Sequence, residues 1–333
     1  MPYRIVLIFG DGIGPEVTAA ARRVVDAAGL DIQWEEHLAG QTALVKLGSP
    51  LPEATLAAVR GANATLKGPT ATPSGTGFRS VNVELRQKLQ LYANYCPAKS
   101  LPGVPSRYEN VDLIVVRENT EGLYSGLEHE VVPGVVESLR IVTEAASERI
   151  ARFAFETARR QGRKRVTCAH KANILKLSDG LFLRTCRRVA GEFSDIAFDD
   201  SIIDATAMKL VLNPHSFDVM VMENLFGDII SDLTAGLVGG LGLTPSANVG
   251  KGVAVFEAVH GTAPDIAGKG IANPTAIILS AVLMLRYLNE KAAADRIENA
   301  VREVFVRGEV RTGDLGGKAS TSEFVESILA AMK

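Results

Sequence analysis

Two aspartates four residues apart, Asp228 and Asp232, are the strongest candidates for chemistry in this chain of 333 residues. They follow a short apolar run, Val219 to Met222, which has the length of a buried strand, and they lie in a segment with helical periodicity. The spacing of four puts both carboxylates on one face of a helix. Small and apolar residues surround them, which favours a buried pair over solvated surface acids. Two carboxylates in such a setting need a counter-charge, and this predicts a divalent cation.

A second group of polar side chains follows the glycine-rich loop that contains Gly75 and Gly77. Ser80 and Asn82 stand at the start of a predicted helix, and Arg86 lies on its polar side. Capping preference alone makes a plain helix cap an equally good interpretation of the first two. The functional alternative is that all three side chains converge on an anion near the helix N-terminus, where the helix dipole favours negative charge.

Two cationic residues follow directly on predicted strands. Arg117 comes after the apolar run from Val111 to Val116, and an arginine at the carboxyl end of a strand is typical of a carboxylate anchor. Lys171 comes after the strand predicted from Arg165 to His170. A lysine held against an apolar run can have a lowered pKa and can serve as a base.

The elements that must position these residues alternate between strands and helices. The first unit has a strand from Ile5 to Phe9, a turn from Gly10 to Gly14, and a helix that ends near Ala28. Pro15 stands where a dinucleotide-binding fingerprint needs glycine, so we interpret this segment as a tight turn. The repeated alternation predicts an α/β fold with a mostly parallel sheet and helices on both faces.

Two segments fit no regular element of such a sheet. Residues Gly126 to Thr143 alternate between apolar and polar types around a Pro133-Gly134 turn, which predicts a β-hairpin. It has no obvious partner in the sheet, so we expect it to pair with another subunit. The second segment, His260 to Pro274, is a long loop dense in glycine and proline, and such loops are usually functional.

Composition limits the class of protein. The chain is 47% hydrophobic with a net charge of −2, which allows a large core and two lobes and gives no reason to expect a nucleic-acid or membrane partner. Its three cysteines, Cys96, Cys168 and Cys186, contain no C-x-x-C motif and are interpreted as reduced thiols. The chain has no apolar run of about 20 residues, and the N-terminus lacks the layout of a signal peptide. We therefore predict a cytoplasmic protein.

Six motifs together carry a resemblance that covers nearly the whole chain: GDGIGPEV, RSVNVELR, RENTEGLY, HKANILK, NLFGDIISD and HGTAPDIAGKGIANP. The chain resembles the β-decarboxylating hydroxyacid dehydrogenases, which comprise isocitrate, isopropylmalate and homoisocitrate dehydrogenases. The resemblance implies a two-lobed fold, with residues 1–95 and 241–333 in a large cofactor-side domain and 96–240 in a small domain with the metal site and dimer interface. It also implies at least a homodimer, with active sites shared between subunits and the hairpin as an arm that joins them.

The same resemblance implies catalytic roles. Asp228 and Asp232 would hold Mg²⁺ or Mn²⁺ together with the partner subunit's Asp204. Lys171, also supplied across the interface, would assist removal of the proton from the substrate hydroxyl. Tyr124 would protonate the enolate that remains after decarboxylation. This division agrees with the chemistry, since hydride leaves a carbon that bears a hydroxyl and a base must take the hydroxyl proton.

Substrate and cofactor follow from the resemblance as well. Arg86 and Arg117 would bind carboxylates of a small tricarboxylate or hydroxyacid. Isopropylmalate dehydrogenases have apolar residues in the segment that contains Ser80 and Asn82, which can instead donate hydrogen bonds to a carboxymethyl group. The predicted activity is therefore NAD-dependent oxidative decarboxylation of isocitrate to 2-oxoglutarate, a tricarboxylic acid cycle reaction. Asp265 favours NAD, because a carboxylate repels a 2′-phosphate. The predicted NAD-binding residues are Thr72, Asn173, His260, Gly261, Asp265, Ile266 and Asn273.

One departure from the family pattern leaves alternatives open. Active members have arginine where this chain has Cys96, so the carboxylate clamp is weakened, or Lys99 replaces the charge, or the substrate has another carboxylate arrangement. Homoisocitrate or isopropylmalate dehydrogenase are alternative activities. A non-catalytic regulatory subunit of a hetero-oligomeric isocitrate dehydrogenase is an alternative of another class, because such subunits also lack this arginine. They tend to lose metal ligands, however, and here the ligands are present, which favours an enzyme.

Overall fold

A computed structural model describes residues 2–73, 75 and 77–333 of the chain. The strands are β1 (Tyr3–Ile8), β2 (Ile32–His37), β3 (Ala64–Lys67), β4 (Ala93–Lys99), β5 (Asp112–Glu118), β6 (Gly122–Val132), β7 (Val135–Ile141), β8 (Arg165–His170), β9 (Ala197–Ile202), β10 (Val219–Met222), β11 (Pro245–Val249) and β12 (Ala254–Ala258). The α-helices are α1 (Gly14–Asp26), α2 (Gln41–Leu47), α3 (Glu53–Gly61), α4 (Val81–Lys88), α5 (Glu144–Arg160), α6 (Ser178–Ala190), α7 (Ile203–Leu212), α8 (Asn224–Leu237), α9 (Thr275–Tyr287), α10 (Lys291–Arg307) and α11 (Thr321–Ala331).

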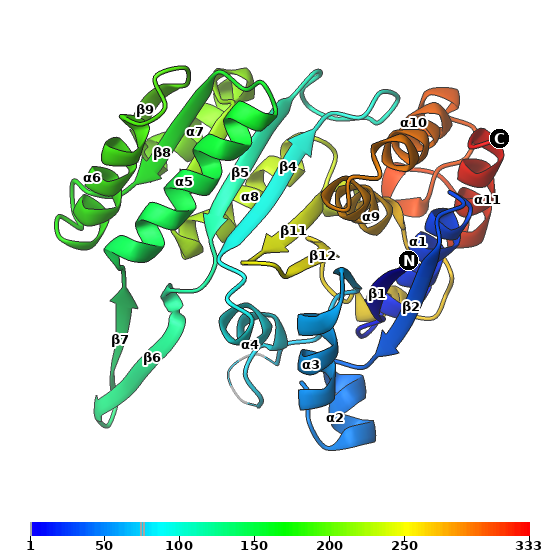
Figure 1. Ribbon diagram of the computed structural model, residues 1–333, viewed down its shortest axis with the longest axis horizontal. Helices are drawn as coiled ribbons and strands as arrows, with labels where there is room; N and C mark the ends of the chain where they lie inside the picture. The colour runs from blue at the N-terminus through cyan, green and yellow to red at the C-terminus, as the bar shows by residue number, and fades with distance from the viewer. Residues whose placement is uncertain (1, 74, 76) are drawn as a thin grey trace.

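One continuous mixed sheet runs through the molecule in the order β2-β1-β3-β12-β11-β4-β5-β10-β8-β9 (Figure 1). Most neighbouring pairs are parallel, which confirms the predicted α/β class with flanking helices. The two middle strands are exceptions, since β11 is antiparallel to β12 and β4, and β4 is antiparallel to β5. Neither strand was predicted, because Pro97 interrupts β4 and Pro245, Ser246 and Asn248 make β11 resemble a loop.

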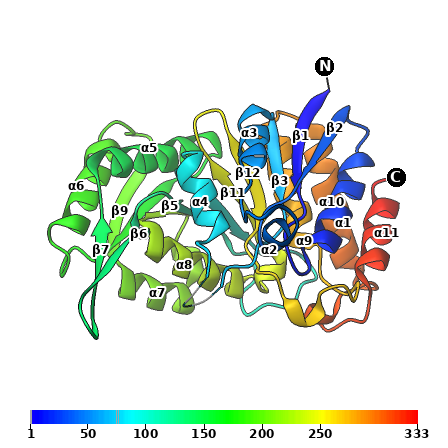
Figure 2. The ribbon, with the colours of Figure 1, turned by 90° about the horizontal axis from the view of Figure 1, so that it is seen from below.

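Helices cover both faces of the sheet, as Figures 1 and 2 show. At the β9 end, α5 and α6 pack on one face through Ile150, Phe155 and Phe182, whereas α7 and α8 cover the other. At the β2 end, α1, α9, α10 and α11 form one apolar layer and α3 and α4 the opposite one. Within the described residues no helix is both long and apolar enough to cross a bilayer. The two layers with α4 and α8 flank the middle strands, and this is where the site lies.

The first and last parts of the chain meet at one end of the sheet, where β3 pairs with β12 and α1 contacts α11. The predicted domain boundaries, between 95 and 96 and between 240 and 241, remain a prediction. The first boundary falls inside β4, which joins the two ends of the sheet by pairing with β11 and β5.

The hairpin of β6 and β7 is present and forms its own two-stranded sheet away from the body of the molecule (Figure 1). Apolar side chains on it are open to solvent: Leu127 is 51% exposed and Val136 is 65% exposed. A cluster of exposed apolar residues marks an interaction surface. The role of the hairpin between subunits stays a prediction.

Candidate functional site

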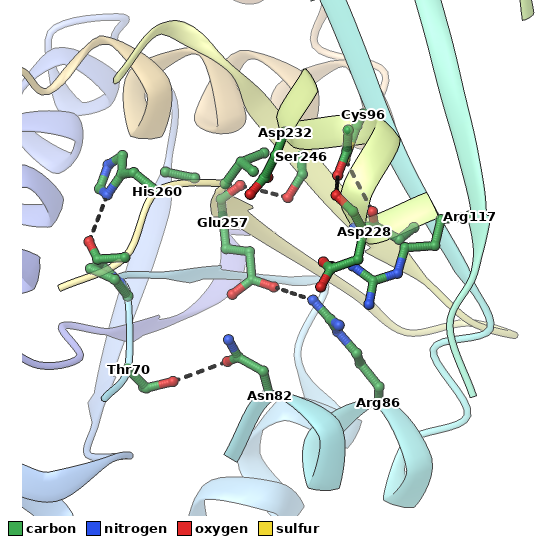
Figure 3. A pocket seen from close by; sticks show the side chains of 16 residues that line it. Thr70, Asn82, Arg86, Cys96, Arg117, Asp228, Asp232, Ser246, Glu257 and His260 are labelled. Carbon is green, nitrogen blue, oxygen red and sulfur yellow. Dashed lines mark hydrogen bonds and ion pairs between the residues drawn. The ribbon is translucent and has the colours of Figure 1, made fainter. Parts of the chain in front are cut away.

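A cavity of 170 Å³ lies between α4, α8 and the middle strands of the sheet (Figure 3). The middle strands β12, β11, β4 and β5 all supply polar groups to it. The residues that line it are Pro69, Thr70, Asn82, Arg86, Asn94, Cys96, Arg117, Asp228, Ser231, Asp232, Ser246, Glu257, Ala258, Val259, His260 and Gly261. The cavity thus brings together predicted substrate- and metal-site residues from distant segments, namely Asn82, Arg86, Arg117, Asp228 and Asp232.

Helix α8 presents Asp228 and Asp232 to the cavity from successive turns, as the spacing predicted. The expectation that apolar neighbours bury the pair is wrong for the single chain, because Ile229 is 57% exposed and the Asp228 side chain is 45% exposed. Partial burial and the nearby charge of Asp228 raise the pKa of Asp232. The raised pKa indicates negative charge that the chain leaves poorly compensated.

Arg117 is buried and lies across the start of α8. Its Nε and Nη2 donate hydrogen bonds to Asn224 Oδ1 at 3.0 and 2.7 Å, and its Nη1 forms an ion pair with Asp228. This close approach requires glycine at position 227, because a Cβ there would clash with the Arg117 side chain. The hydroxyl of Tyr124 also donates a hydrogen bond to Asp228. Burial and this hydrogen bond raise the pKa of Tyr124.

Arg86 reaches the cavity from α4 and lies 3.5 Å from Glu257 (Figure 3). Glu257 is buried, accepts a hydrogen bond from Lys67 at 2.6 Å and another from Asn248 at 2.7 Å. Burial alone raises the pKa of Glu257, but the charges of Lys67 and Arg86 outweigh burial and bring the pKa to about 2. Sequence reasoning missed Glu257 and Lys67. The available signal was a charged residue in each of two short apolar segments, Lys67 in one and Glu257 in the other. The structure shows that these segments are neighbouring strands, in which the two residues pair in register.

Ser80 and Asn82 have different environments. Ser80 precedes α4, but its side chain makes no capping bond and instead accepts a hydrogen bond from Thr72 at 3.2 Å. Asn82 lines the cavity, where its side-chain oxygen accepts a hydrogen bond from Thr70 at 3.0 Å. Of the predicted pair, only Asn82 therefore borders the cavity directly.

Cys96 also lines the cavity, next to Arg86 and Arg117. Burial raises the pKa of its thiol to about 12, so the thiol is neutral at pH 7 and donates a hydrogen bond to Asn94 Oδ1 at 3.0 Å. The suggestion that Lys99 replaces a charge here is wrong. Lys99 lies on the opposite face of β4, because it is an odd number of residues away along the strand. Its ammonium lies 3.6 Å from Asp112, outside the cavity.

Lys171 and Asp204 form a separate pair outside the cavity lining. The Lys171 ammonium donates a hydrogen bond to Asp204 at 2.7 Å, and this bond lowers the pKa of Asp204. The Asp204 side chain is 69% exposed, and Asn173 is exposed as well. Within the part of the chain that the structure describes, no three His, Cys, Asp or Glu side chains are grouped as a metal site.

His260 and Gly261 lie at the cavity edge, in the loop that follows β12. The loop is held against the first turn of the chain, where Ile13 donates a backbone hydrogen bond to Thr262 at 2.9 Å. His260 Nδ1 is 3.0 Å from the Gly261 carbonyl, whereas its buried Nε2 has no hydrogen-bond partner among the described residues. Burial lowers the pKa of His260, which keeps the ring neutral. A neutral imidazole with one free nitrogen suits a polar ligand.

The remaining predicted cofactor residues lie further along this loop or near α4. Asp265 is exposed in the short helix Pro264–Ile266, next to the half-buried Ile266, and Thr72 is exposed. Asn273 is buried, with its side-chain oxygen accepting hydrogen bonds from Thr275 and its nitrogen donating one to Asp314 at 2.9 Å. Asn273 therefore also supports the loop and the start of α9.

Comparison with known proteins gives consistent matches. A family model described as isocitrate/isopropylmalate dehydrogenase matches residues 4–328. The chain is 54% identical to a mitochondrial catalytic subunit of NAD isocitrate dehydrogenase from Arabidopsis thaliana, over 98% of this chain and 88% of that protein. It is 51% identical to a mitochondrial regulatory subunit of NAD isocitrate dehydrogenase from Dictyostelium discoideum, over 98% and 91%. It is 54% identical to the chloroplastic 3-isopropylmalate dehydrogenase of Solanum tuberosum, over 92% and 86%.

A solved structure agrees with these relatives. The crystal structure of isocitrate dehydrogenase from Methylococcus capsulatus matches with a TM-score of 0.97 and 52% identity, over 99% of both chains. The names of the relatives correct one prediction. Several carry mitochondrial isocitrate dehydrogenase names, and this contradicts the predicted cytoplasmic localisation.

Proposed function

The chain belongs to the isocitrate/isopropylmalate dehydrogenase family, and we propose on this basis that it is an NAD-dependent isocitrate dehydrogenase that produces 2-oxoglutarate and CO₂. The observation that carries the proposal is the cavity between α4 and α8, where Arg86, Arg117 and Tyr124 surround or adjoin Asp228. Two guanidinium groups suit substrate carboxylates, and a carboxylate pair suits a divalent cation.

The residues present fit a divalent metal. Asp228 and Asp232 would hold Mg²⁺ or Mn²⁺, and the raised pKa of Asp232 supports a site that needs positive charge. A bound metal supplies charge stabilisation to the substrate hydroxyl and carboxylate oxygens. Asp228 contacts Arg117 and Tyr124 in this structure. Both contacts would keep the carboxylate oriented toward the cavity.

The residues also fit NAD. The free Nε2 of His260 and the exposed Asp265 are available to the adenosine part of a dinucleotide. A bound dinucleotide would supply the hydride acceptor, and these residues would bind and orient it. Asp265 would accept a hydrogen bond from a ribose hydroxyl and would repel a 2′-phosphate.

Proton transfer is assigned to two groups. Tyr124 has a raised pKa and donates to Asp228, so it holds a proton beside the cavity and can deliver it to the enolate carbon. Lys171 lies outside the cavity lining of its own chain. We assign Lys171 and Asp204 to the cleft of a second subunit in a homodimer, where the lysine would take part in removing the hydroxyl proton. The exposed apolar side chains of the hairpin support such a dimer.

A second candidate function is a regulatory subunit of a hetero-oligomeric isocitrate dehydrogenase. Cys96 favours it, because a neutral thiol next to Arg86 and Arg117 leaves the cavity with two cationic side chains. One relative that is 51% identical is named a regulatory subunit. The intact set of Tyr124, Lys171 and Asp228 favours the catalytic function.

Titration of the purified chain with isocitrate, NAD and Mg²⁺ tests the proposal. We expect NADH and CO₂ to form without any other protein. Isopropylmalate and homoisocitrate are assayed in parallel under the same conditions. If either compound is turned over faster than isocitrate, that compound is the substrate. Binding of isocitrate without turnover of any substrate would support the regulatory function.

A further inference from the structure

Arg140 lies at the base of the hairpin, between two buried acids. Its Nη1 donates a hydrogen bond to Asp179 Oδ1 at 2.5 Å, and its Nη2 lies 3.3 Å from Glu223 Oε2. The Arg140 side chain is 13% exposed, and those of Asp179 and Glu223 are 2% and 6% exposed. Removing one member of such a buried group leaves a charge without compensation, unlike a surface ion pair. This group therefore holds its surroundings in place.

Asp179 connects Arg140 to Lys171. It lies in the first turn of α6, and its Oδ2 accepts a hydrogen bond from the backbone nitrogen of Lys171 at 2.6 Å. Lys171 is the first residue after β8, so this bond fixes the direction in which the chain leaves the strand. The position of the Lys171 backbone determines where its ammonium can reach.

Glu223 connects Arg140 to α8. Its Oε1 accepts a hydrogen bond from the Phe226 nitrogen at 2.9 Å and so caps the helix. The Arg140 guanidinium also lies over the Phe226 ring, 5.3 Å from its centroid. Asp228 follows two residues later, so the orientation of this first turn determines where its carboxylate points.

We propose that Arg140 is a positioning residue that fixes Lys171 and the carboxylates of α8 relative to each other. The inference rests on the proposed function, in which the α8 carboxylates serve the chain's own cleft and Lys171 serves the cleft of the second subunit. An arginine suits this task because its planar guanidinium has separate nitrogens for two acids, whereas a lysine has a single ammonium. Because Lys171 is assigned to the second subunit's cleft, Arg140 would connect the two clefts of the dimer through the base of the hairpin.

Three variants test the inference. Arg140→Met removes the charge and keeps an unbranched side chain. Arg140→Lys keeps the charge but has a single ammonium nitrogen as hydrogen-bond donor. Arg163→Met is the matched control, because Arg163 is 19% exposed and also contacts two acids, Asp112 and Asp218, away from the cavity. Hydrogen exchange is measured at the amides of Lys171 and Phe226, together with the kinetics of isocitrate turnover.

We expect Arg140→Met to accelerate exchange at both amides by about tenfold or more relative to the rest of the chain. We expect kcat to fall by about 100-fold, with KM changed less, since small displacements of reacting groups cost that much. Arg140→Lys should recover part of both losses, and Arg163→Met should change neither amide. Unchanged exchange at both amides in Arg140→Met, or equal acceleration in Arg163→Met, would overturn the inference.

If Arg140→Met does not fold, Arg140→Lys and Glu223→Gln, which keeps the capping oxygen, are measured with the same two readouts. The exchange result does not depend on activity. An unmodified chain that turns over no isocitrate would refute the proposed function, while exchange would still decide whether Arg140 holds the two amides.

Discussion

The ammonium of Lys171 and the carboxylate of Asp204 are 2.7 Å apart, yet neither residue lines the cavity that contains Asp228 and Arg86. All four residues are assigned to the same reaction. Within a single chain, however, Lys171 and Asp204 lie outside the cavity, whereas Asp228 and Arg86 line it. A shared active site resolves this separation, because a second subunit can bring its Lys171 and Asp204 to the cavity of the first.

Mixing two inactive variants tests this arrangement. Lys171→Met and Asp228→Asn are each expected to be inactive as homodimers. In the mixed dimer, one cleft combines an intact Asp228 with an intact Lys171, so about half of its sites are active, and random mixing restores about a quarter of normal activity. The measurement is isocitrate turnover by co-expressed, differently tagged subunits.

The control for this experiment mixes Lys171→Met with Asp204→Asn. Both positions are supplied by the same subunit, so every cleft of the mixed dimer receives one defective residue and activity should stay absent. Recovery in this control, or no recovery in the first mixture, would contradict the shared site.

Removal of one metal ligand should nearly abolish activity. We expect Asp228→Asn to lower kcat/KM by on the order of 1,000-fold, because both the cation and the oxygens it stabilises lose charge compensation. Asp195→Asn, at an exposed carboxylate paired with Arg159, is the control and should be close to normal. Measured rates with Mg²⁺, with Mn²⁺ and with excess chelator complete the test. Full activity in excess chelator would rule out the metal.

The helix that carries Asp228 and Asp232 could be predicted from the sequence because an apolar strand, a polar break and small periodic residues follow one another. The exposure of the pair could not be predicted, because solvent access depends on how far the segments that pack on α8, such as β5 and β6, cover it, and these contacts join distant parts of the chain. Glu257 and Lys67 were missed for a similar reason. Each lies in or at the end of a short apolar strand, and only the register of β3 with β12 reveals that they face each other.

The buried pair of Lys67 and Glu257 should contribute to stability. Lys67→Met leaves the Glu257 carboxylate poorly compensated and should destabilise the fold by about 3–5 kcal/mol. The double variant Lys67→Met/Glu257→Gln should recover part of this loss, because neither charge of the pair remains, although Arg86 loses its contact with the Glu257 carboxylate. Urea unfolding at pH 7 and fixed protein concentration measures both. A double variant no more stable than the single one would contradict this account.

The same pair predicts a dependence of stability on pH. The pKa of Glu257 is about 2 in the folded chain, below the value of about 4.3 for an unfolded glutamate. The folded state therefore binds this proton less readily, so the stabilisation is fully present above about pH 4.3 and is lost as the pH falls toward 2. Glu257→Gln should flatten the loss of stability in this acidic range, as followed by circular dichroism.

Cofactor choice is expected to depend on Asp265 and Ile266. We expect NAD to give a kcat/KM at least about tenfold higher than NADP, because like charges placed together are unfavourable. The double variant Asp265→Lys/Ile266→Tyr should shift the ratio toward NADP by supplying a cation and a phenol hydroxyl to the 2′-phosphate. Lys269→Asp, at a nearby exposed position of the same loop, is the control. A higher kcat/KM with NADP in the unmodified chain would show that the assignment is wrong.

Cys96 provides the last prediction. Its thiol is neutral, since burial raises its pKa to about 12, and it stands beside Arg86 and Arg117 in the cavity. A hydrogen bond to a charged group contributes about 1.5–3 kcal/mol, so an arginine here would improve substrate binding by about ten- to a hundredfold. We expect Cys96→Arg to lower the KM for isocitrate with kcat changed less, the pattern of restored uniform binding. Cys96→Met adds a long side chain without a charge, so it separates the effect of the arginine charge from the effect of side-chain size. Lys99→Ala should leave KM unchanged, because Lys99 contacts Asp112 on the other face of β4. An unchanged or higher KM in Cys96→Arg would show that the cavity is built for a substrate with a different carboxylate arrangement.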